Sequence, residues 1–307
     1  MNKSVLITGA NIGLGKETAR QLAKIPGTEK IYLACRNANK AAEAKKDLER
    51  ITGRSIFEIV IMDITDVDSV KLAVSKINEP IDGLVLNAGG MGGRNPNEIT
   101  KSGMNFISAT NLTGHVVLVD ELLSQDKLKK TVVYVSSEAA RGIEKMQMPR
   151  PDLKTTSVEE IKTVLDGSFF GKKLDPAQAY GYVKYIGTLW IASLTKKHPS
   201  IKFVSVSPGA TSGTAVADNL PPMLKFMFKY VMFPIIMPLR GMVHSVEKGA
   251  ERYVNVLNNK EYETGNFYAS VEDKVTGKLV EQSTIFVNFQ NEEYQENASK
   301  AIHQFLN

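Results

Sequence analysis

Residues 4–15 read SVLITGANIGLG, an apolar run that passes into a segment with three glycines. The run has the length of a buried strand, and Thr18, Leu22 and Ile25 follow at helical spacing. Glycines between a strand and a helix allow a tight turn and let backbone N–H groups approach a pyrophosphate at the helix N-terminus. This context predicts a dinucleotide-binding loop; the alternative is a plain strand-to-helix turn. The loop residues expected to contact the dinucleotide are Gly9, Asn11, Ile12, Gly13, Leu14 and Gly15.

Apolar runs alternate with helical periods through the first half of the chain. Continuous apolar strands separated by helices are typical of a parallel sheet covered on both faces. We therefore expect an α/β fold in which one doubly wound, Rossmann-type sheet forms a single domain over residues 1–307. After the first strand, the expected strands are 31–34, 56–62, 84–86 and 131–135, with helices at 38–51, 66–77 and 101–125.

The alternation breaks after residue 141. Residues 142–175 are polar and contain prolines, with one short helix expected at 157–165. The rhythm then resumes, and no internal repeat or low-complexity linker marks a domain boundary. The later elements are expected at 176–197 (helix), 201–206 (strand), 245–257 (helix) and 265–269 (strand), with an amphipathic helix around Tyr294, Ala298, Ile302 and Phe305.

The residues after the next strands suggest how a dinucleotide is held. No acid lies between residues 31 and 39, where NAD-specific sites often place one for the ribose 2′-hydroxyl. Arg36 could instead bind a 2′-phosphate through its planar guanidinium, which predicts NADP(H). Asp63, with the Ile64 backbone beside it, could accept from the adenine amino group, although Asp is also a common helix cap and Asp66 competes for that role. The fourth strand ends in Asn87, Ala88 and Gly89, where a ligand crosses the strand ends.

A tyrosine and a lysine form the candidate catalytic pair. Of ten tyrosines, only Tyr180 has a lysine four positions on, Lys184, so both side chains share one helix face. A free phenol has a pKa of about 10 and is a poor acid or base at neutral pH. A nearby ammonium lowers that pKa, and the pair could then exchange a proton with a carbonyl or alcohol oxygen.

The order of these motifs is more specific than any one of them. Asn111 is expected on the long fourth helix, Ser137 follows the fifth strand, and Pro208-Gly209 follows the sixth. Together with the glycine loop, Asn87-Ala88-Gly89 and the Tyr180/Lys184 pair, this order resembles that of short-chain dehydrogenases/reductases over residues 4–269.

The resemblance implies a role for each matching residue. Ser137 would hydrogen-bond the substrate oxygen, with Ser136 as the alternative serine, and Tyr180 would exchange its proton, with Tyr182 as the alternative phenol. Lys184 would hold the nicotinamide ribose and lower the tyrosine pKa, and Asn111 would anchor a relay water. Pro208 and Gly209 would pass beside the nicotinamide, with Ala210 and Thr211 near its carboxamide.

Two departures from the family pattern stand out. Ser137 and Tyr180 are 43 residues apart (180 − 137), so residues 142–175 resemble an insertion at the active-site rim. The threonine common five residues after the proline is replaced by Gly213, and Thr214 follows. A long insertion here, with an apolar segment after Pro208-Gly209, resembles the branch of the family that contains retinol dehydrogenases and protochlorophyllide reductases. Cys35 lies at the adenosine end, which argues against pigment reduction, said to use a cysteine at the pigment site.

The segment 220–243 holds five of the 11 methionines among phenylalanines and prolines. Flexible methionines and rigid aromatics make an adaptable apolar surface, so residues 212–243 are expected to form a substrate lid over a hydrophobic ketone, aldehyde or secondary alcohol. Core packing and peripheral membrane contact are the alternatives. Lysines and prolines interrupt the segment, which argues against a transmembrane span.

Composition limits the other function classes. The formal charge is +5, and the basic pairs Lys45-Lys46, Lys129-Lys130 and Lys196-Lys197 are expected at helix ends, which argues against a nucleic-acid interface. The four histidines and single cysteine show no metal-ligand spacing, so no metal is expected. One cysteine and no visible secretory signal fit the cytoplasm. A homo-oligomer, reduction of a conjugated C=C bond and a non-catalytic NADP(H) sensor stay open.

Overall fold

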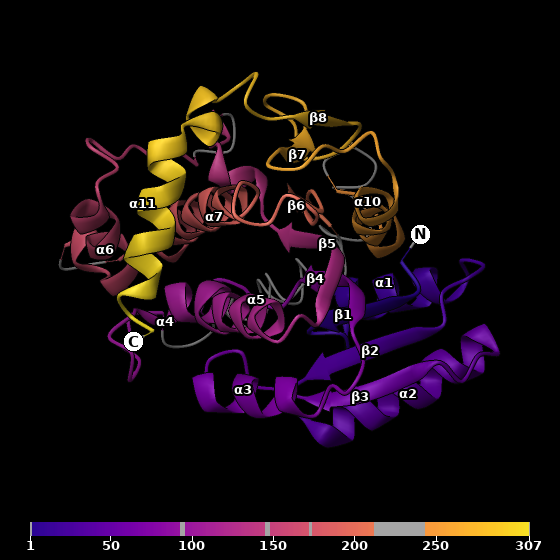
Figure 1. Cartoon of the computed structure of the whole chain (residues 1–307). Coiled ribbons are helices and arrows are strands. Elements are labelled where there is room, and N and C mark those ends of the chain that lie inside the picture. Colours follow the sequence, from indigo (N-terminus) through magenta and orange to yellow (C-terminus); the bar gives the residue numbers. More distant parts are fainter. Residues whose placement is uncertain (1, 93–95, 145–147, 172–173, 212–242, 307) are drawn as a thin grey trace, which may run out of the picture.

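The computed structural model describes residues 2–92, 96–144, 148–171, 174–211 and 243–306. Within these ranges, eight strands form one sheet in the order β3-β2-β1-β4-β5-β6-β7-β8 (Figure 1). All neighbours pair in parallel except β7 and β8, which are antiparallel. The predicted doubly wound α/β fold is therefore confirmed. The strands are β1 (Ser4–Thr8), β2 (Lys30–Cys35), β3 (Phe57–Ile61), β4 (Ile81–Leu86), β5 (Leu128–Val135), β6 (Lys202–Val206), β7 (Phe267–Ser270) and β8 (Leu279–Glu281).

Helices cover both faces of the sheet, as the continuous apolar strands require (Figure 1). Alternate residues of β1 point to opposite faces: Leu6 packs in one core, and Val5 and Ile7 pack in the other. The core around Val5 and Ile7 is closed by α1 (Gly13–Ala23), α2 (Ala38–Thr52) and α10 (Val246–Asn258), and the core around Leu6 by α3 (Val67–Ser75), α5 (Gly114–Ser124) and α7 (Pro176–Ser193).

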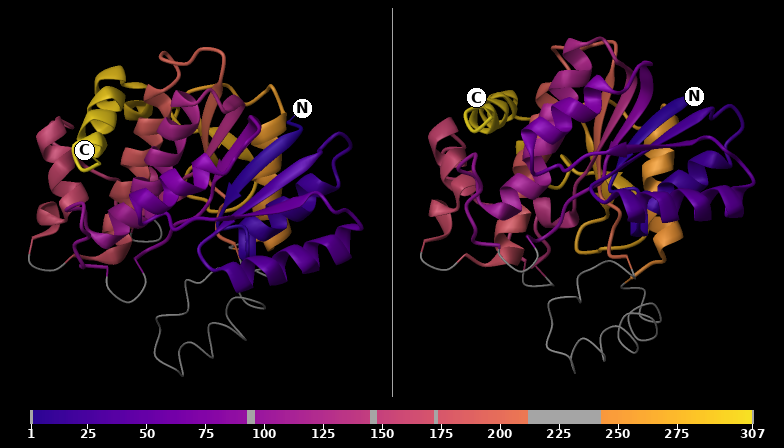
Figure 2. Two further views of the ribbon diagram at one scale, coloured as in Figure 1. Left: turned by 60° about the horizontal axis from the view of Figure 1, so that its bottom comes forward. Right: turned by 90° about the horizontal axis from the view of Figure 1, so that it is seen from below.

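Two further helices form an outer layer over α7. α11 (Glu292–His303) contacts α7 and α6 (Val158–Asp166), and Figure 2 shows it outside α7 in both views. The described part of the 142–175 insertion, with α6 and the short helix η4 (Ser168–Phe170), packs against α7 and α11. The chain termini lie on opposite sides of the molecule (Figure 2). The insertion therefore supports the helix that carries Tyr180.

The predicted helix 101–125 is wrong at its start. Residues 100–103 form a turn in which Gly103 adopts a φ of 85°, and Asn105 caps the following helix by accepting from the Ser108 N–H. The helix continues as α4 (Phe106–Ser108), a π-helical turn η1 (Ala109–Thr113) and α5. The extra backbone residue in that turn was not visible in the apolar spacing. It displaces Asn111 from the regular helical register, as π-turns at functional sites often do.

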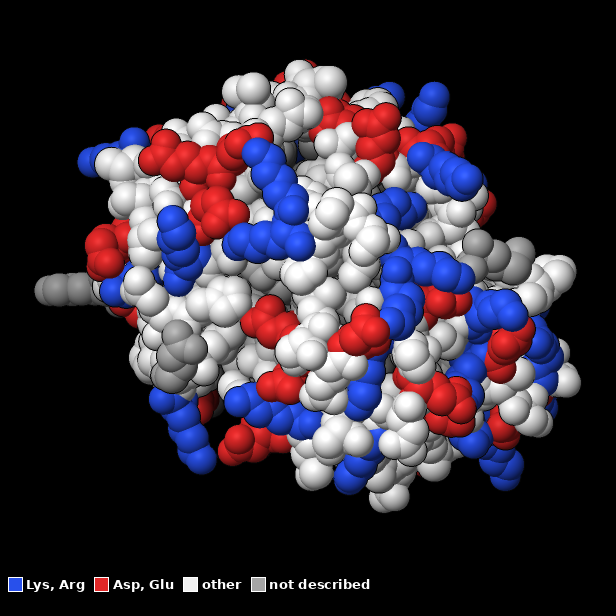
Figure 3. All heavy atoms as spheres, in the orientation of Figure 1, with Lys and Arg blue, Asp and Glu red and all other residues white. Residues whose placement is uncertain are grey.

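Two of the three basic pairs predicted at helix ends lie elsewhere, and only Lys196-Lys197 lie at a helix end. Lys45-Lys46 lie inside α2, Lys129-Lys130 lie in β5, and Lys196-Lys197 follow the last residue of α7. Most of these lysines pair with acids, for example Lys130 with Asp82 (2.9 Å) and Lys196 with Glu292 (2.7 Å). On the face shown in Figure 3, basic and acidic side chains alternate rather than gather by sign. β8, an antiparallel edge strand of three residues, was not predicted.

The expected substrate lid at 212–243, with Gly213, Thr214 and the five methionines, lies outside the described residues except for Val243. Among the helices of the described ranges, none is long and apolar enough to cross a membrane.

Asn105 joins the insertion to the start of the helix that carries Asn111. Its buried side-chain amide donates to the carbonyl oxygens of Val164 and Leu165 in α6, both at 2.9 Å. Asn105→Ala should lower the free energy of unfolding by about 2 kcal/mol, because two buried acceptors and one cap lose their partner. Urea unfolding measures this, with the exposed Asn97→Ala as the control. Equal stability of the two variants would show that the insertion is not held through Asn105.

Candidate active site

The glycine loop connects β1 to the N-terminus of α1. Gly9 has a φ of 67°, and a Cβ there would lie 3.1 Å from Nδ2 of Asn87. A Cβ on Gly15 would lie 2.7 Å from the same nitrogen. The N-cap residue of α1, Ile12, makes no side-chain hydrogen bond to the helix, so the first backbone N–H groups stay available to an anion. The loop therefore fits a pyrophosphate at this end of the sheet.

The loop is fixed to the end of β4 by side-chain and backbone contacts. The Thr8 hydroxyl accepts from the N–H groups of Asn87 and Ala88, both at 2.9 Å, and the Asn87 amide donates to the Thr8 carbonyl at 2.8 Å. Since the strand order reverses between β1 and β4, these contacts lie at the crevice where doubly wound sheets bind ligands.

Arg36 and Asp63 lie together beside this loop, at the ends of β2 and β3. The Arg36 side chain is 74% exposed, and its Nη1 lies 3.8 Å from Oδ2 of Asp63. Asp63 accepts from the N–H and hydroxyl of Thr65, whereas Asp66 caps α3. Asp63 is therefore not the helix cap, and an exposed guanidinium stands where a 2′-phosphate is expected.

Cys35 lies beneath the glycine loop. Its side chain is 2% exposed, and its sulfur accepts from the backbone N–H groups of Ala10 and Asn11. Burial raises the pKa of the thiol to about 11. The thiolate is the reactive form of cysteine, so this thiol is shielded chemically as well as sterically.

Tyr180 and Ser137 meet at the carboxyl end of β5. The Tyr180 hydroxyl is hydrogen-bonded to Ser137, whose Oγ also accepts from the Ala139 N–H at 3.2 Å. That acceptance leaves the Ser137 proton to be donated to Tyr180 or to a substrate oxygen. Burial raises the pKa of Tyr180 to about 12, and the hydrogen bond from Ser137 offsets only part of the rise. The hydroxyl groups of Ser137 and Tyr180 therefore lie together at the edge of the sheet that also holds the glycine loop.

Lys184 lies one turn along α7 from Tyr180. Its Nζ donates to the Val135 carbonyl at 2.8 Å and lies 5.5 Å from the centroid of the Tyr180 ring. Burial lowers the pKa of Lys184 to about 7, so a large share is uncharged at neutral pH. Burial is the largest influence on the pKa of both groups, and the expected effect of Lys184 on the Tyr180 pKa stays a prediction.

The Asn111 side chain clamps the backbone that follows β4. Its amide donates to the carbonyls of Gly90 (2.7 Å) and Ile107 (2.8 Å), and its Oδ1 accepts from the Gly90 N–H at 3.2 Å. Both side-chain N–H groups and the side-chain oxygen are therefore bonded to the backbone. The Asn111 backbone carbonyl, in the π-helical turn, can accept from a water.

The alternative hydroxyl groups point elsewhere. Ser136 Oγ lies 2.7 Å from the Thr188 hydroxyl against the backbone of α7 and is buried. The Tyr182 hydroxyl bonds the backbone of Asp152, and its ring packs on Phe169 and Phe170. Neither group faces Ser137 and Tyr180.

The segment Pro208–Thr211 passes close to the first two turns of α10, at Gly249 and Arg252. Gly209 has a φ of 74°, and a Cβ there would lie 2.9 Å from Nη1 of Arg252. The Gly209 N–H donates to the Ser207 hydroxyl (3.0 Å), and Thr211 donates to the Gly209 carbonyl (3.1 Å). The loop is thus held from below by buried polar groups that the sequence analysis did not identify.

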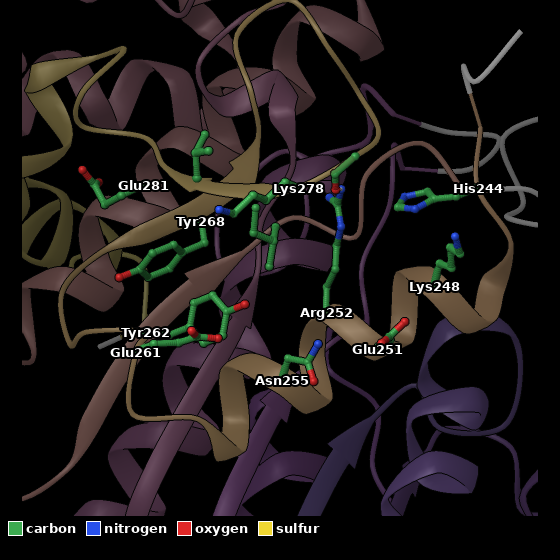
Figure 4. Close-up of a pocket in the computed structure, with 13 residues that line it drawn as sticks. His244, Lys248, Glu251, Arg252, Asn255, Glu261, Tyr262, Tyr268, Lys278 and Glu281 are labelled. Atoms are coloured by element: carbon green, nitrogen blue, oxygen red, sulfur yellow. The ribbon is translucent and has the colours of Figure 1, made fainter.

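A pocket of about 440 Å³ lies between α10 and the β7–β8 pair (Figure 4). Arg252 stands between His244 at one end and the tyrosines Tyr262 and Tyr268 at the other. The lining includes none of the predicted cofactor or catalytic residues. Among the described residues, no three or more His, Cys, Asp or Glu side chains are grouped as a metal site.

Comparison with known proteins agrees with this fold and order of motifs. A family model described as "short chain dehydrogenase" matches residues 3–148. Human retinol dehydrogenase 13 is 38% identical over 130 residues, 41% of this chain and 38% of that protein. Protochlorophyllide reductase B from rice is 26% identical over 288 residues, 87% of this chain and 69% of that protein. The NADPH-bound carbonyl reductase from chicken fatty liver has a similar fold, with a TM-score of 0.59 at 20% identity, covering 90% of this chain and 99% of that one.

These findings define the class first: a doubly wound α/β protein of the nucleotide-binding kind. More narrowly, the chain is similar to the short-chain dehydrogenase/reductase family, and among its members to retinol dehydrogenases and protochlorophyllide reductases. The alignment spans well under two thirds of human retinol dehydrogenase 13.

His115 is a site residue that the sequence analysis weighed only as a metal ligand. It lies within 3.1 Å of the Asn111 carbonyl through Nδ1 and of the Thr8 hydroxyl through Nε2. A carbonyl can only accept, so Nδ1 carries the proton and Nε2 accepts from Thr8. Burial lowers its pKa to about 3, with Lys184 adding to the effect. The neutral ring thus ties the π-helical turn to β1.

His115 should show one neutral tautomer across pH 5–8 in ring-nitrogen NMR. Its folded pKa lies below its unfolded value of about 6.5, so its contribution to stability is complete above pH 6.5 and is lost as pH falls toward 3. His303 is the internal control, because its hydrogen bond to Asp120 raises its pKa. Titration of His115 between pH 5 and 8 would contradict the assignment.

Proposed function

We propose that this protein is an NADP(H)-dependent oxidoreductase that transfers a hydride between nicotinamide and a hydrophobic ketone, aldehyde or secondary alcohol. The observation that carries the proposal is the hydrogen bond between Tyr180 and Ser137, with Lys184 one turn away, at the sheet edge that holds the glycine loop. The similarity to short-chain dehydrogenases and to retinol dehydrogenase 13 supports the reaction class. The proposal treats the chain as one cytoplasmic domain.

The cofactor end supports a dinucleotide with a 2′-phosphate. Gly9 and Gly15 let the loop pack closely on Asn87, and the uncapped start of α1 offers its N–H groups to a pyrophosphate. Arg36 is exposed and lies beside Asp63, where it can turn toward a phosphate at little cost. Asp63, Ile64, Asn87, Ala88 and Gly89 then line the rest of the binding crevice, and Thr211 lies at its nicotinamide end.

In the reductive direction, a bound NADPH supplies the hydride that reaches the carbonyl carbon. Ser137 donates a hydrogen bond to the carbonyl oxygen, because its own Oγ is already an acceptor for Ala139. Tyr180 gives its proton to that oxygen as negative charge develops there. A raised pKa keeps Tyr180 protonated at neutral pH, the form that proton donation requires. The alcohol forms, and Tyr180 is left to be reprotonated.

Lys184 and Asn111 provide the route for that proton. Lys184 can move its Nζ from the Val135 carbonyl to the ribose hydroxyls of the cofactor. The Asn111 carbonyl, fixed by His115, can hold a water between Lys184 and solvent. A lysine whose pKa lies near 7 exchanges protons readily at physiological pH.

The substrate class rests on the apolar segment 220–243, and the retinol dehydrogenase similarity supports it. Reduction of a conjugated C=C bond is the alternative within the enzymes. The sensor alternative is disfavoured, because the four groups that catalysis needs, Ser137, Tyr180, Lys184 and Asn111, all converge.

Tyr180→Phe removes the hydroxyl and keeps the ring. Turnover of apolar carbonyls with NADPH should fall by ~10²-fold or more, the scale of lost acid–base catalysis, while NADPH binding stays intact. Tyr182→Phe is the matched control, since its hydroxyl bonds the Asp152 backbone instead. Unchanged turnover in Tyr180→Phe would remove this tyrosine from the mechanism.

Arg36→Asp should weaken NADPH binding far more than NADH binding, because only NADPH carries the 2′-phosphate that the new carboxylate repels. Titrations with each cofactor, followed by the fluorescence of Trp190, measure both affinities. Arg50→Asp is the control, a similarly exposed arginine in the last turn of α2. Equal weakening of the two cofactors by Arg36→Asp would refute the contact.

A further inference from the structure

Two buried, oppositely charged side chains lie directly behind the candidate active site. Glu138 follows Ser137 in the sequence, and Arg252 comes from the middle of α10. Their side chains are 4% and 7% exposed, and Oε1 of Glu138 lies 3.5 Å from Nη1 of Arg252. Neither residue belongs to the motifs that define the family resemblance, and the proposed proton transfer uses neither.

The Glu138 carboxylate binds groups from two neighbouring strand ends. One oxygen accepts from the Ser207 hydroxyl, and the other accepts from the Ser270 hydroxyl (2.9 Å) and N–H (3.3 Å). The ends of β5, β6 and β7 are therefore joined through one carboxylate. Hydrogen bonds to an ionised acceptor are short and directional, so they fix these three ends relative to one another.

Arg252 completes the same network from the other side. Its Nη1 donates to the Ser207 carbonyl (3.1 Å), and its Nη2 donates to the Ser270 hydroxyl (3.1 Å) and to the Gly277 carbonyl (2.7 Å). Besides the Glu138 carboxylate, the guanidinium thus binds two groups that adjoin it, at Ser207 and Ser270, and the Gly277 carbonyl. The planar fork of arginine suits this set in a way that lysine does not.

The network connects Glu138 and Arg252 to two parts of the candidate active site, Ser137 and the Pro208–Gly209 loop. The Ser207 hydroxyl donates to Glu138 and accepts from the Gly209 N–H, so it transmits the position of the carboxylate to the loop expected beside the nicotinamide. Arg252 lies directly under that loop, because a Cβ on Gly209 would lie 2.9 Å from its Nη1. On the other side, Ser137 is covalently joined to Glu138.

Stability alone is a poor explanation for such a pair. Desolvating two charges costs about as much as their attraction returns, and apolar replacements of buried pairs are often neutral or stabilising. What apolar side chains do not provide is a fixed direction for each hydrogen bond. The arrangement therefore favours a geometric role over an energetic one.

We propose that Glu138 and Arg252 are positioning residues that hold Ser137 and the Pro208–Gly209 loop in a fixed relation, so that the substrate oxygen and the nicotinamide meet at the right distance. This inference rests on the proposed function. Catalytic geometry is sensitive enough for such a role, since misplacement by about 1 Å can cost on the order of 10²-fold in rate.

Two variants separate positioning from folding. Glu138→Gln keeps the shape and leaves Arg252 without its counter-charge; it should lower both the unfolding temperature and kcat, with kcat reduced ~10-fold or more and the KM for the carbonyl nearly unchanged. The double variant Glu138→Gln/Arg252→Met removes both charges. It should recover the unfolding temperature but not kcat. Both variants should bind NADPH more weakly, because no carboxylate fixes Ser207 and, through it, Gly209.

Asn2→Ala is the control for the loss of a buried polar side chain. Its amide donates to the Leu257 carbonyl (3.1 Å) and to Oδ1 of Asn258 (3.2 Å), at the far end of α10, so it touches no member of the Glu138–Arg252 network. It should lower the unfolding temperature and leave kcat within about twofold. Recovery of kcat in the double variant, or an unchanged kcat in Glu138→Gln, would overturn the positioning role. If Tyr180→Phe lowers kcat while Glu138→Gln does not, only this inference fails; if neither does, the proposed function fails.

Discussion

The site depends on how the ends of β1 and β4 are held together at the crevice between them. Thr8 closes it with one hydroxyl, which accepts from two backbone N–H groups at the end of β4 and donates to His115. His115 in turn holds the Asn111 carbonyl. One buried chain of hydrogen bonds therefore connects the glycine loop to the π-helical turn. Since each member is buried and has a partner, displacing any one of them leaves a polar group unsatisfied.

Much of this arrangement could be predicted from the sequence, because it follows from local patterns. The glycine loop, the strand-and-helix alternation and the four-residue spacing of Tyr180 and Lys184 each act over a few residues, and the parallel sheet brings their ends to one edge. Spacing alone does not bring Ser137 and Tyr180 together, because 43 residues separate them (180 − 137). The order of the motifs along the chain does predict that they lie side by side.

The rest could not be predicted, because it depends on contacts between distant residues. Glu138 and Arg252 are 114 positions apart, and either one reads in sequence as an ordinary surface charge. The sequence shows that His115 is a helical neighbour of Asn111. It does not show that the second ring nitrogen of His115 contacts Thr8. The pKa values of Lys184 and Tyr180 depend on burial by residues distant in the sequence, which lowers the first and raises the second. The predicted helix ends were wrong where a turn intervenes, as at Gly103.

The account's central claim is that a carbonyl group receives the hydride while Tyr180 supplies the proton. The most direct test is to incubate the protein with an apolar α,β-unsaturated ketone and NADPH deuterated at both C4 positions of the nicotinamide, and to locate the deuterium in the product by NMR and mass spectrometry. The account predicts an allylic alcohol with deuterium on the former carbonyl carbon. Deuterium on the β carbon of a saturated ketone, or no transfer to this ketone or to a saturated one, would contradict it.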